Sequence, residues 1–409
     1  MHDGQFVNIQ LNMINLLGRL CILPLICILI IVASCHVDNT TDNKLSYDLA
    51  EVLDSDVEGS LVFTELTDGR IQAEISLSGT GMGDTHPAYI MNNSAAFGGN
   101  ILISLTPVEG STGRSVTVFD KTDIGQELTF DGLSYLHAHV NIYKSANQLN
   151  VLLAQGDIGG NELTDTKTEI ELREEDIEDI SGTMMLYLRK NGGALCVIEL
   201  DNTPAGGRHP AFIRSNSAVE GGLNIIILNT VDGDTGISKT EITTAIDGRT
   251  YDYEDLLSLN GHVSVQLSTN QQDVIIATGD IGSNMLTGES VTYNLAEKDV
   301  EGISGTVTFQ QRNDGTALAT LELRGTPAGG MHPAHVHNNS VDEGGDVAVS
   351  FTPVGGTTGR SVTSIRTTDD GTAITYLALT NYNGYVNVHL SATELQTIVA
   401  QGNIGLNVN

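Results

Sequence analysis

Apolar and polar residues alternate in short runs along most of the chain, a pattern that predicts β-strands. In residues 305–323 (GTVTFQQRNDGTALATLEL), two alternating runs flank Asn313-Asp314-Gly315. A period of two places one face of a strand in a core and the other in solvent. Asn, Asp and Gly accept the positive φ angles of tight hairpin turns. The stretch therefore predicts an antiparallel hairpin.

A continuous apolar run, of a different kind, occupies residues 16–34 (LLGRLCILPLICILIIVAS). It carries one charge, at Arg19, and the polar stretch HVDNTTDNK follows from residue 36. Its length permits either a retained spanning helix or a cleaved export signal. The start of translation stays open between Met1 and Met13, because the residues before Met13 add no basic charge to an export signal.

The pattern after this run repeats at a constant interval. His86, His209 and His332 each precede a proline, and 209 − 86 and 332 − 209 both equal 123. The same interval relates Gly156 to Gly279 and Gly402. A unit of this length matches a common domain size, so we expect three complete domains in tandem. The predicted segments are a signal segment at 1–34, a lipidated N-terminus and tether at 35–42, and domains at 43–165, 166–288 and 289–409.

Composition supports an all-β fold. The chain of 409 residues is 40% hydrophobic, which can supply a core for each domain, and its 45 Gly and absence of Trp fit short strands joined by turns. We therefore expect three tandem antiparallel β-sandwich or barrel domains.

The net charge of the chain limits the classes of molecule that it can bind. The formal net charge is −32, from 51 acidic and 19 basic residues. A surface of this sign repels phosphate backbones, so nucleic acid is excluded as a partner. The acidic excess serves either solubility or cation binding.

The third repeat carries a candidate metal site. His335 and His337 are spaced to share one face of a strand, and His389 lies in the alternating run VNVHL. If the two strands pair, three imidazoles converge on one ion, a set suited to copper or zinc. The alternative is a polar surface cluster. An offset of 123 replaces the triad with other residues in the sister repeats, namely Phe212, Arg214 and Gln266, and Tyr89, Met91 and Tyr143.

The remaining candidates have structural interpretations. His86, His209 and His332 precede φ-restricted prolines and are expected to fix a loop by hydrogen bonding. His137 and His139 are expected to be surface polar residues. Cys196, in the apolar run ALCVIEL, is expected to be a small buried hydrophobe. No shared catalytic motif is visible, so a non-enzymatic protein is favoured.

Two resemblances add to this picture. Val32-Ala33-Ser34-Cys35 resembles the lipobox of bacterial lipoproteins. That resemblance implies lipidation at Cys35 and anchoring in the cell envelope. By analogy with known lipoproteins, His36 after the cysteine favours the outer membrane. The stretches AHVHNNSVDEGGDVAVSF and GYVNVHLSA resemble the CHRD domain of chordin and of many bacterial envelope proteins, and the likeness extends over all three repeats.

The CHRD resemblance implies an immunoglobulin-like or superoxide-dismutase-like antiparallel β fold and no particular reaction. The histidine pattern is also similar to the copper site of copper-zinc superoxide dismutases, but no bridging histidine lies between His337 and His389. We therefore expect a lipid-anchored envelope protein that is a non-enzymatic binding or structural module, with a protein, glycan or metal as its ligand. The alternative is a copper-binding protein or copper-dependent oxidoreductase.

Overall fold

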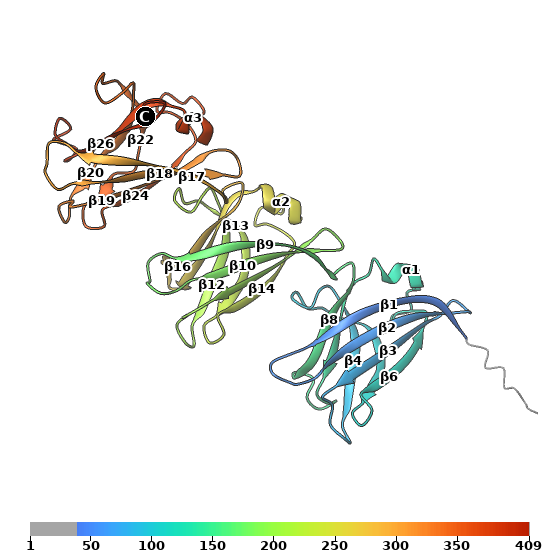
Figure 1. Ribbon diagram of the computed structural model, residues 1–409. Helices are drawn as coiled ribbons and strands as arrows, with labels where there is room; N and C mark the ends of the chain where they lie inside the picture. Colours follow the sequence, from blue (N-terminus) through green and yellow to red (C-terminus); the bar gives the residue numbers. More distant parts are fainter. Residues whose placement is uncertain (1–38, 409) are drawn as a thin grey trace, which may run out of the picture. The chain divides into compact units, whose positions relative to one another are not determined.

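The computed structural model describes residues 39–408 (Figure 1). The predicted signal segment and Cys35 lie outside this range. No helix of the described part combines the length and the apolar character needed to cross a bilayer. The described chain is built of antiparallel strands with three helices of at most six residues, so the all-β prediction is confirmed.

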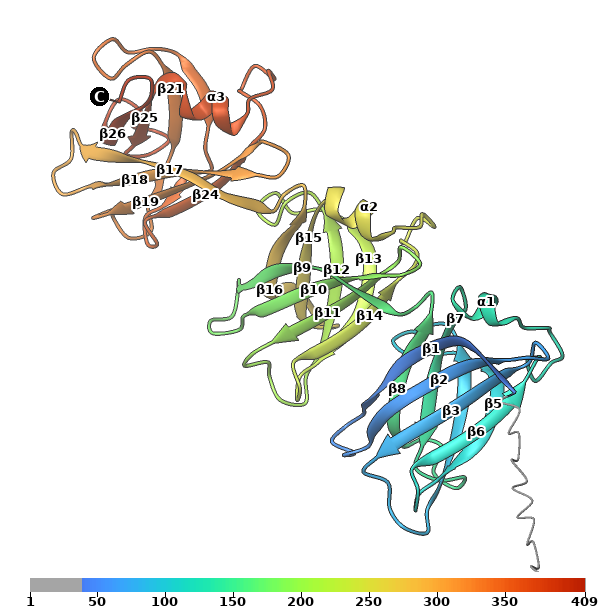
Figure 2. The ribbon, with the colours of Figure 1, turned by 45° about the vertical axis from the view of Figure 1, so that its right-hand side comes forward.

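Repeat 1 is a closed antiparallel barrel with the strand order β1-β2-β3-β6-β5-β4-β7-β8. Strands β3 and β4 do not pair; β3 pairs with β6 and β4 with β7, which are Greek-key crossings. Figure 2 shows β1, β2, β3 and β6 side by side. The elements are β1 (Thr40–Glu51), β2 (Glu58–Leu66), β3 (Ile71–Ser78), β4 (Thr85–Asn92), β5 (Ile101–Glu109), β6 (Arg114–Phe119), α1 (Phe130–Leu133), β7 (His137–Tyr143) and β8 (Leu152–Gly159).

Repeat 2 has the order β13-β12-β15-β16-β9-β10-β11-β14, with the same neighbours except that β13 and β14, the counterparts of the paired β5 and β6, are the two ends of the sheet. Its elements are β9 (Leu163–Glu174), β10 (Gly182–Arg189), β11 (Ala194–Leu200), β12 (Arg208–Ser215), β13 (Asn224–Asp232), β14 (Ile237–Ile242), α2 (Tyr253–Ser258), β15 (Asn260–Ser268) and β16 (Gln271–Gly282).

Repeat 3 has ten shorter strands in the order β20-β23-β24-β19-β18-β17-β26-β25-β21-β22, because β20 and β21 together match the single strand β4 or β12 of the sister repeats, and β22 and β23 together match β5 or β13. Its elements are β17 (Leu286–Glu297), β18 (Ser304–Arg312), β19 (Ala317–Arg324), β20 (Met331–His332), β21 (Ala334–Asn338), β22 (Val347–Ser350), β23 (Val354–Gly355), β24 (Arg360–Ile365), α3 (Tyr376–Thr380), β25 (Asn383–His389) and β26 (Ile398–Gly405).

The predicted hairpin is present. Strands β18 and β19 pair in antiparallel register, and Gly315 in the connecting turn has a φ of 79°. Each repeat has its own apolar cluster, and each cluster lies inside one of the three predicted domain ranges. The domain boundaries themselves stay a prediction.

One glycine of the repeat marks a close approach of two strands. A Cβ on Gly156, Gly279 or Gly402 would lie 2.1, 2.2 and 2.1 Å, respectively, from a backbone carbonyl oxygen of the facing strand β1, β9 or β17. Such a distance is inside any van der Waals contact, so only glycine fits. The recurrence of this glycine therefore follows from packing.

Consecutive repeats are joined by hydrogen bonds as well as by the chain. The amide of Asn191 donates to the carbonyl of Gly160 at 2.9 Å, and the amide of Asp314 donates to the carbonyl of Ser283 at 3.1 Å. A fully buried arginine lies at each joint. Arg189 pairs with Asp157 and Arg312 with Asp280, so each arginine reaches an aspartate of the preceding repeat.

Candidate metal centre

The pairing of β21 with β25 brings the three predicted ligands of repeat 3 together. His335 lies opposite Asn387 and His337 opposite Tyr385, and β25 ends at His389. Val336, Val386 and Val388 point to the other face and are 0% exposed in the core. One ring nitrogen from each of His335, His337 and His389 lies within 4.8 Å of the others, and this is the ligand group found in the described chain. The sequence prediction that the imidazoles converge is therefore confirmed.

Backbone carbonyls orient two of the three rings. Nδ1 of His389 lies 2.7 Å from the carbonyl oxygen of Leu395, and Nδ1 of His337 lies 3.0 Å from that of Gly345. A carbonyl oxygen only accepts, so both Nδ1 atoms carry the proton and both Nε2 atoms keep a lone pair. This is the arrangement by which an outer hydrogen bond fixes the tautomer of a metal-binding histidine.

The ring nitrogens that face one another in the triad carry too few protons for all of them to form hydrogen bonds. Nδ1 of His335 lies 3.1 Å from Nε2 of His389, a contact that requires the His335 nitrogen to donate. Nε2 of His337 is buried and has no hydrogen-bond partner. An unpartnered buried lone pair costs free energy, and a metal ion would satisfy it. The donor set is therefore Nδ1 of His335 with Nε2 of His337 and of His389.

Burial favours the neutral form of two of the rings, His335 and His389. It is the main cause that lowers the pKa of His335, and the nearby rings of His389 and His337 lower it further. Burial also lowers the pKa of His389, again with His337 contributing and with the Leu395 carbonyl opposing. A neutral imidazole is the form that ligates a metal, so the lowered pKa favours the ligating form of His335 and of His389.

The surroundings supply support without a fourth ligand. Tyr385 stacks on the ring of His337, with centroids 5.0 Å apart and planes 16° apart. Asp369 is occupied by Ser350, whose amide and hydroxyl donate to it at 2.9 and 2.7 Å. Asn387, beside His335 on the same face, has a buried Oδ1 without a hydrogen-bond partner. One coordination position of an ion here would be left to solvent or to a small ligand.

The sister repeats fill the same place differently. In repeat 1, Tyr89 and Tyr143 meet edge to face with centroids 5.9 Å apart. In repeat 2, Nε of Arg214 donates to the carbonyl of Gly222 at 3.0 Å, which is the counterpart of the bond from His337 to Gly345. The barrel therefore does not need the triad.

The histidines of the three His-Pro pairs each make one bond to a backbone carbonyl. Nδ1 lies 3.0 Å from Lys144 O in His86, 2.8 Å from Leu267 O in His209 and 3.2 Å from His389 O in His332. In each ring Nε2 is buried with no partner. The carbonyls belong to the segment at the end of β7, β15 or β25, so each ring ties its own strand to that segment. His332 thereby positions the backbone of His389.

The expectation of two surface histidines in repeat 1 is wrong for one of them. His137 is exposed, but His139 is 1% exposed, and its Nδ1 lies 2.9 Å from the carbonyl oxygen of Asn93. The second face of β7 is covered by the loop at Asn93, so alternation does not lead to solvent there. His262 in repeat 2 makes the same bond to Asn216, also at 2.9 Å. The offset of 123 that relates His139 to His262 was the signal for a shared buried role.

Cys196 is 1% exposed, and burial raises the pKa of its thiol to about 12. The thiolate that a nucleophile or metal ligand needs is therefore not populated near neutral pH. The prediction of a buried hydrophobe is confirmed.

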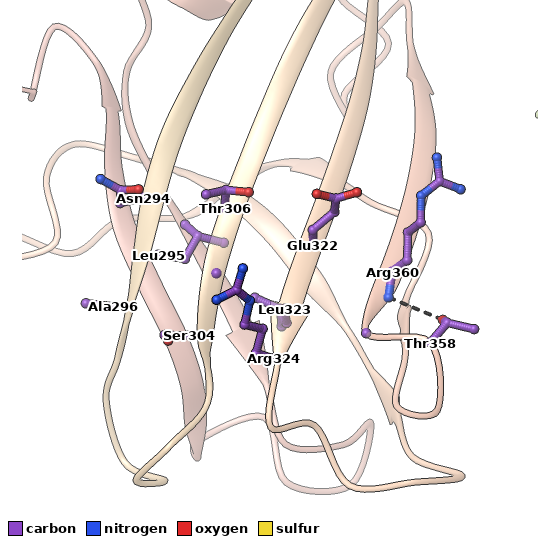
Figure 3. A pocket seen from close by; sticks show the side chains of 12 residues that line it. Asn294, Leu295, Ala296, Ser304, Thr306, Glu322, Leu323, Arg324, Thr358 and Arg360 are labelled. Carbon is purple, nitrogen blue, oxygen red and sulfur yellow. Dashed lines mark hydrogen bonds between the residues drawn. The ribbon is translucent and has the colours of Figure 1, made fainter.

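A separate surface cavity of about 590 Å³ is lined by residues of β17, β18 and β19 and by the turn that leads into β24. Figure 3 shows its polar side chains, among them Asn294, Thr306, Glu322 and Arg360. It contains none of the predicted site residues, so it is distinct from the histidine triad.

Comparison with known proteins identified no similar protein. No protein-family model matches this chain, and no curated protein or solved structure matches it either. The site is therefore interpreted from its own geometry.

Proposed function

We propose that repeat 3 binds one transition-metal ion, copper in the first place and zinc as the alternative, through His335, His337 and His389. The observation that carries this proposal is the buried, unpartnered Nε2 of His337, which faces two further imidazoles within 4.8 Å. Three imidazole nitrogens without thiolate or carboxylate suit copper and zinc, and copper(II) binds such sites most tightly among the divalent first-row metals.

The size of the site supports this assignment. Metal–nitrogen bonds of roughly 2.0–2.1 Å place tetrahedral ligand atoms about 3.3 Å apart. The 3.1 Å contact of His335 with His389 already meets this value, and the separations up to 4.8 Å close by rotation of side chains. Binding would replace the His335–His389 hydrogen bond, with the proton of His335 moving to its Nε2.

The chain's own groups suggest a metal carrier more than a redox enzyme. Hydrogen bonds to Leu395 and Gly345 hold two ligands in orientation, and the stack with Tyr385 limits movement of a ligand ring. Among the described residues no fourth histidine, cysteine, aspartate or glutamate joins the group. We therefore infer a site that holds an ion and leaves one position exchangeable.

Metal analysis of the full chain tests this proposal. After dialysis against copper and removal of excess ion, we expect about one copper per chain. Two variants use residues that the sister repeat already carries: His337→Arg keeps a donor toward Gly345, and His389→Gln matches Gln266. Both are expected to lose the ion, whereas His137→Ala, in repeat 1, is the control that retains it. A wild-type chain without copper, or a fully loaded His337→Arg chain, would refute the site.

We also propose that the chain is a lipid-anchored protein of the bacterial cell envelope, in the outer membrane, with tandem CHRD-like domains. The lipobox-like VASC at residues 32–35 and the repeated AHVHNNSVDEGG-type pattern support this. Repeats 1 and 2, which lack the triad, would act as binding or structural units. Labelling with palmitate tests the anchor, because incorporation should disappear in Cys35→Ala; equal labelling of that variant would end the proposal.

A further inference from the structure

The two joints between repeats have similar structures, but they differ in one residue, an arginine that is present at only one of them. At the joint of repeats 2 and 3, Arg366 reaches across to the preceding repeat. Its guanidinium lies 2.5 Å from Oδ1 of Asn284, 3.5 Å from Oδ1 of Asn260 and 3.3 Å from Oε1 of Glu220, and within its own repeat it lies 2.6 Å from Oδ2 of Asp314. The side chain is 27% exposed, so the groups around it cover most of its surface.

At the joint of repeats 1 and 2, the same space is a cavity of about 590 Å³. The counterpart of Arg366 at an offset of 123 is Thr243, which is too short to fill it. The counterparts of the four partners of Arg366 line this cavity together with Thr243; they are His137, Asn161, Asn191 and Phe97. The second joint therefore shows what group this architecture accepts when the space is filled.

The lining of the open cavity suits a cation. Glu241, Asp252 and Asp255 line it, whereas no lysine or arginine does. Glu241 binds Arg189 through Oε2, and Asp252 and Asp255 each accept one capping bond of α2, at 2.8 and 3.2 Å. The other oxygen of each carboxylate has no hydrogen bond among the described residues. At the filled joint the carboxylates are instead Glu220 and Asp314, so negative charge is present in both joints at different positions.

Two aromatic side chains complete the cavity. Phe97 is 61% exposed, and Tyr251 lines the wall beside the carboxylates. The ring of Tyr251 already accepts a guanidinium, because Arg249 lies over it with 6.0 Å between the guanidinium carbon and the ring centroid. Planar guanidinium groups stack on aromatic faces and bind carboxylates at the same time.

We propose that the cavity between repeats 1 and 2 binds a small guanidinium compound, which takes the place that Arg366 takes at the next joint. The volume is in the range of small-molecule sites, and the acidic chain raises the local concentration of cations. The site is independent of the histidine triad, so it stands or falls separately from metal binding.

Calorimetric titration of the full chain with N-acetylarginine amide tests the proposal. We expect one site in the wild type and at least tenfold weaker binding of N-acetylcitrulline amide, which has the same shape without the charge. Thr243→Arg would supply the guanidinium from the chain and abolish binding. Arg366→Thr would open the second joint and raise the stoichiometry to two.

Phe97→Ala is a second variant, which leaves the cavity open, unlike Thr243→Arg. We expect it to weaken binding while the unfolding temperature stays unchanged. The proposal is overturned if the wild type shows no saturable binding, if the citrulline analogue binds equally well, or if Thr243→Arg folds normally and still binds the ligand. Unchanged stoichiometry in Arg366→Thr would also contradict it, because the filled joint is the basis of the assignment.

Discussion

The buried ion pair of Arg312 and Asp280 allows a quantitative prediction for the variant Asp280→Asn. The Arg312 side chain is 0% exposed, and its Nη2 lies 3.1 Å from Oδ2 of Asp280. None of its guanidinium nitrogens has a hydrogen-bond partner. Asparagine preserves the local structure, because Oδ1 of Asp280 accepts from Ala218 and the native Asn403 makes the equivalent bond to Val341. The variant therefore removes the charge and little else.

The cost follows from leaving a buried cation without its partner. Breaking a buried ion pair from one side costs about 3–5 kcal/mol of unfolding free energy. Arg366 disfavours the charged form of Arg312, but Glu220 and Asp314 both favour it and stay in the variant, so we expect the lower end, about 3 kcal/mol. Burial raises the pKa of Asp280 and lowers that of Arg312, which means that burial outweighs their attraction. Replacing both should therefore cost much less than replacing one.

Two comparison variants make the prediction specific. Asp157→Asn should cost less, about 2 kcal/mol, because Arg189 keeps Glu241 at 2.8 Å and the carbonyl of Asn161. In the double variant Asp280→Asn with Arg312→Leu, the leucine copies the residue that repeat 1 carries at this position, Leu66, and most of the lost stability should return.

Scanning calorimetry of the full-length chain measures these effects. For a domain of this size, about 3 kcal/mol corresponds to a decrease in unfolding temperature of roughly 12 °C. A smaller decrease for Asp280→Asn than for Asp157→Asn would refute the reasoning. So would a double variant that is less stable than Asp280→Asn, since the cost would then not arise from an unpaired buried charge.

Three further predictions concern the cores. Burial lowers the pKa of His139 and His262, so the unfolded chain binds more protons; stability should fall as the pH drops below about 6.5, and urea midpoints at pH 7.5 and 5.5 should differ less in His262→Gln. Gly402→Ala places a Cβ 2.1 Å from Asn294 O, and we expect a loss of more than about 1 kcal/mol in urea unfolding. Cys196 should not react with a thiol reagent in the native chain but should react in 6 M urea, because burial raises its pKa to about 12.

Strand alternation and the constant offset were enough to predict much of the fold. They identified the hairpin at Asn313–Gly315. They also placed His335 and His337 on one face. The pairing of β21 with β25 was only a condition in the sequence argument, because register between distant strands depends on the whole barrel.

Alternation could not predict what covers the second face of a strand. His139 and Arg189 occupy positions whose pattern indicates solvent, yet both are 1% exposed. A loop of the same repeat covers His139, and the preceding repeat covers Arg189. The periodicity of a single strand indicates neither contact. The offset of 123 gives a partial indication, because it relates His139 to His262 and Arg189 to Arg312, polar residues that recur at one position of two repeats.

Differences between the repeats separate what the barrel needs from what a site needs. Arg189 and Arg312 are matched by Asp157 and Asp280, whereas the remaining copies of these positions are neutral, namely Leu66 and Asn403. A charge buried without its partner would cost several kcal/mol, so charges at these positions are tolerated only in pairs. The triad also changes as a set: its three histidines stand where repeat 2 has Phe212, Arg214 and Gln266 and where repeat 1 has Tyr89, Met91 and Tyr143. Substitutions that change jointly across the repeats are therefore the ones that define a site.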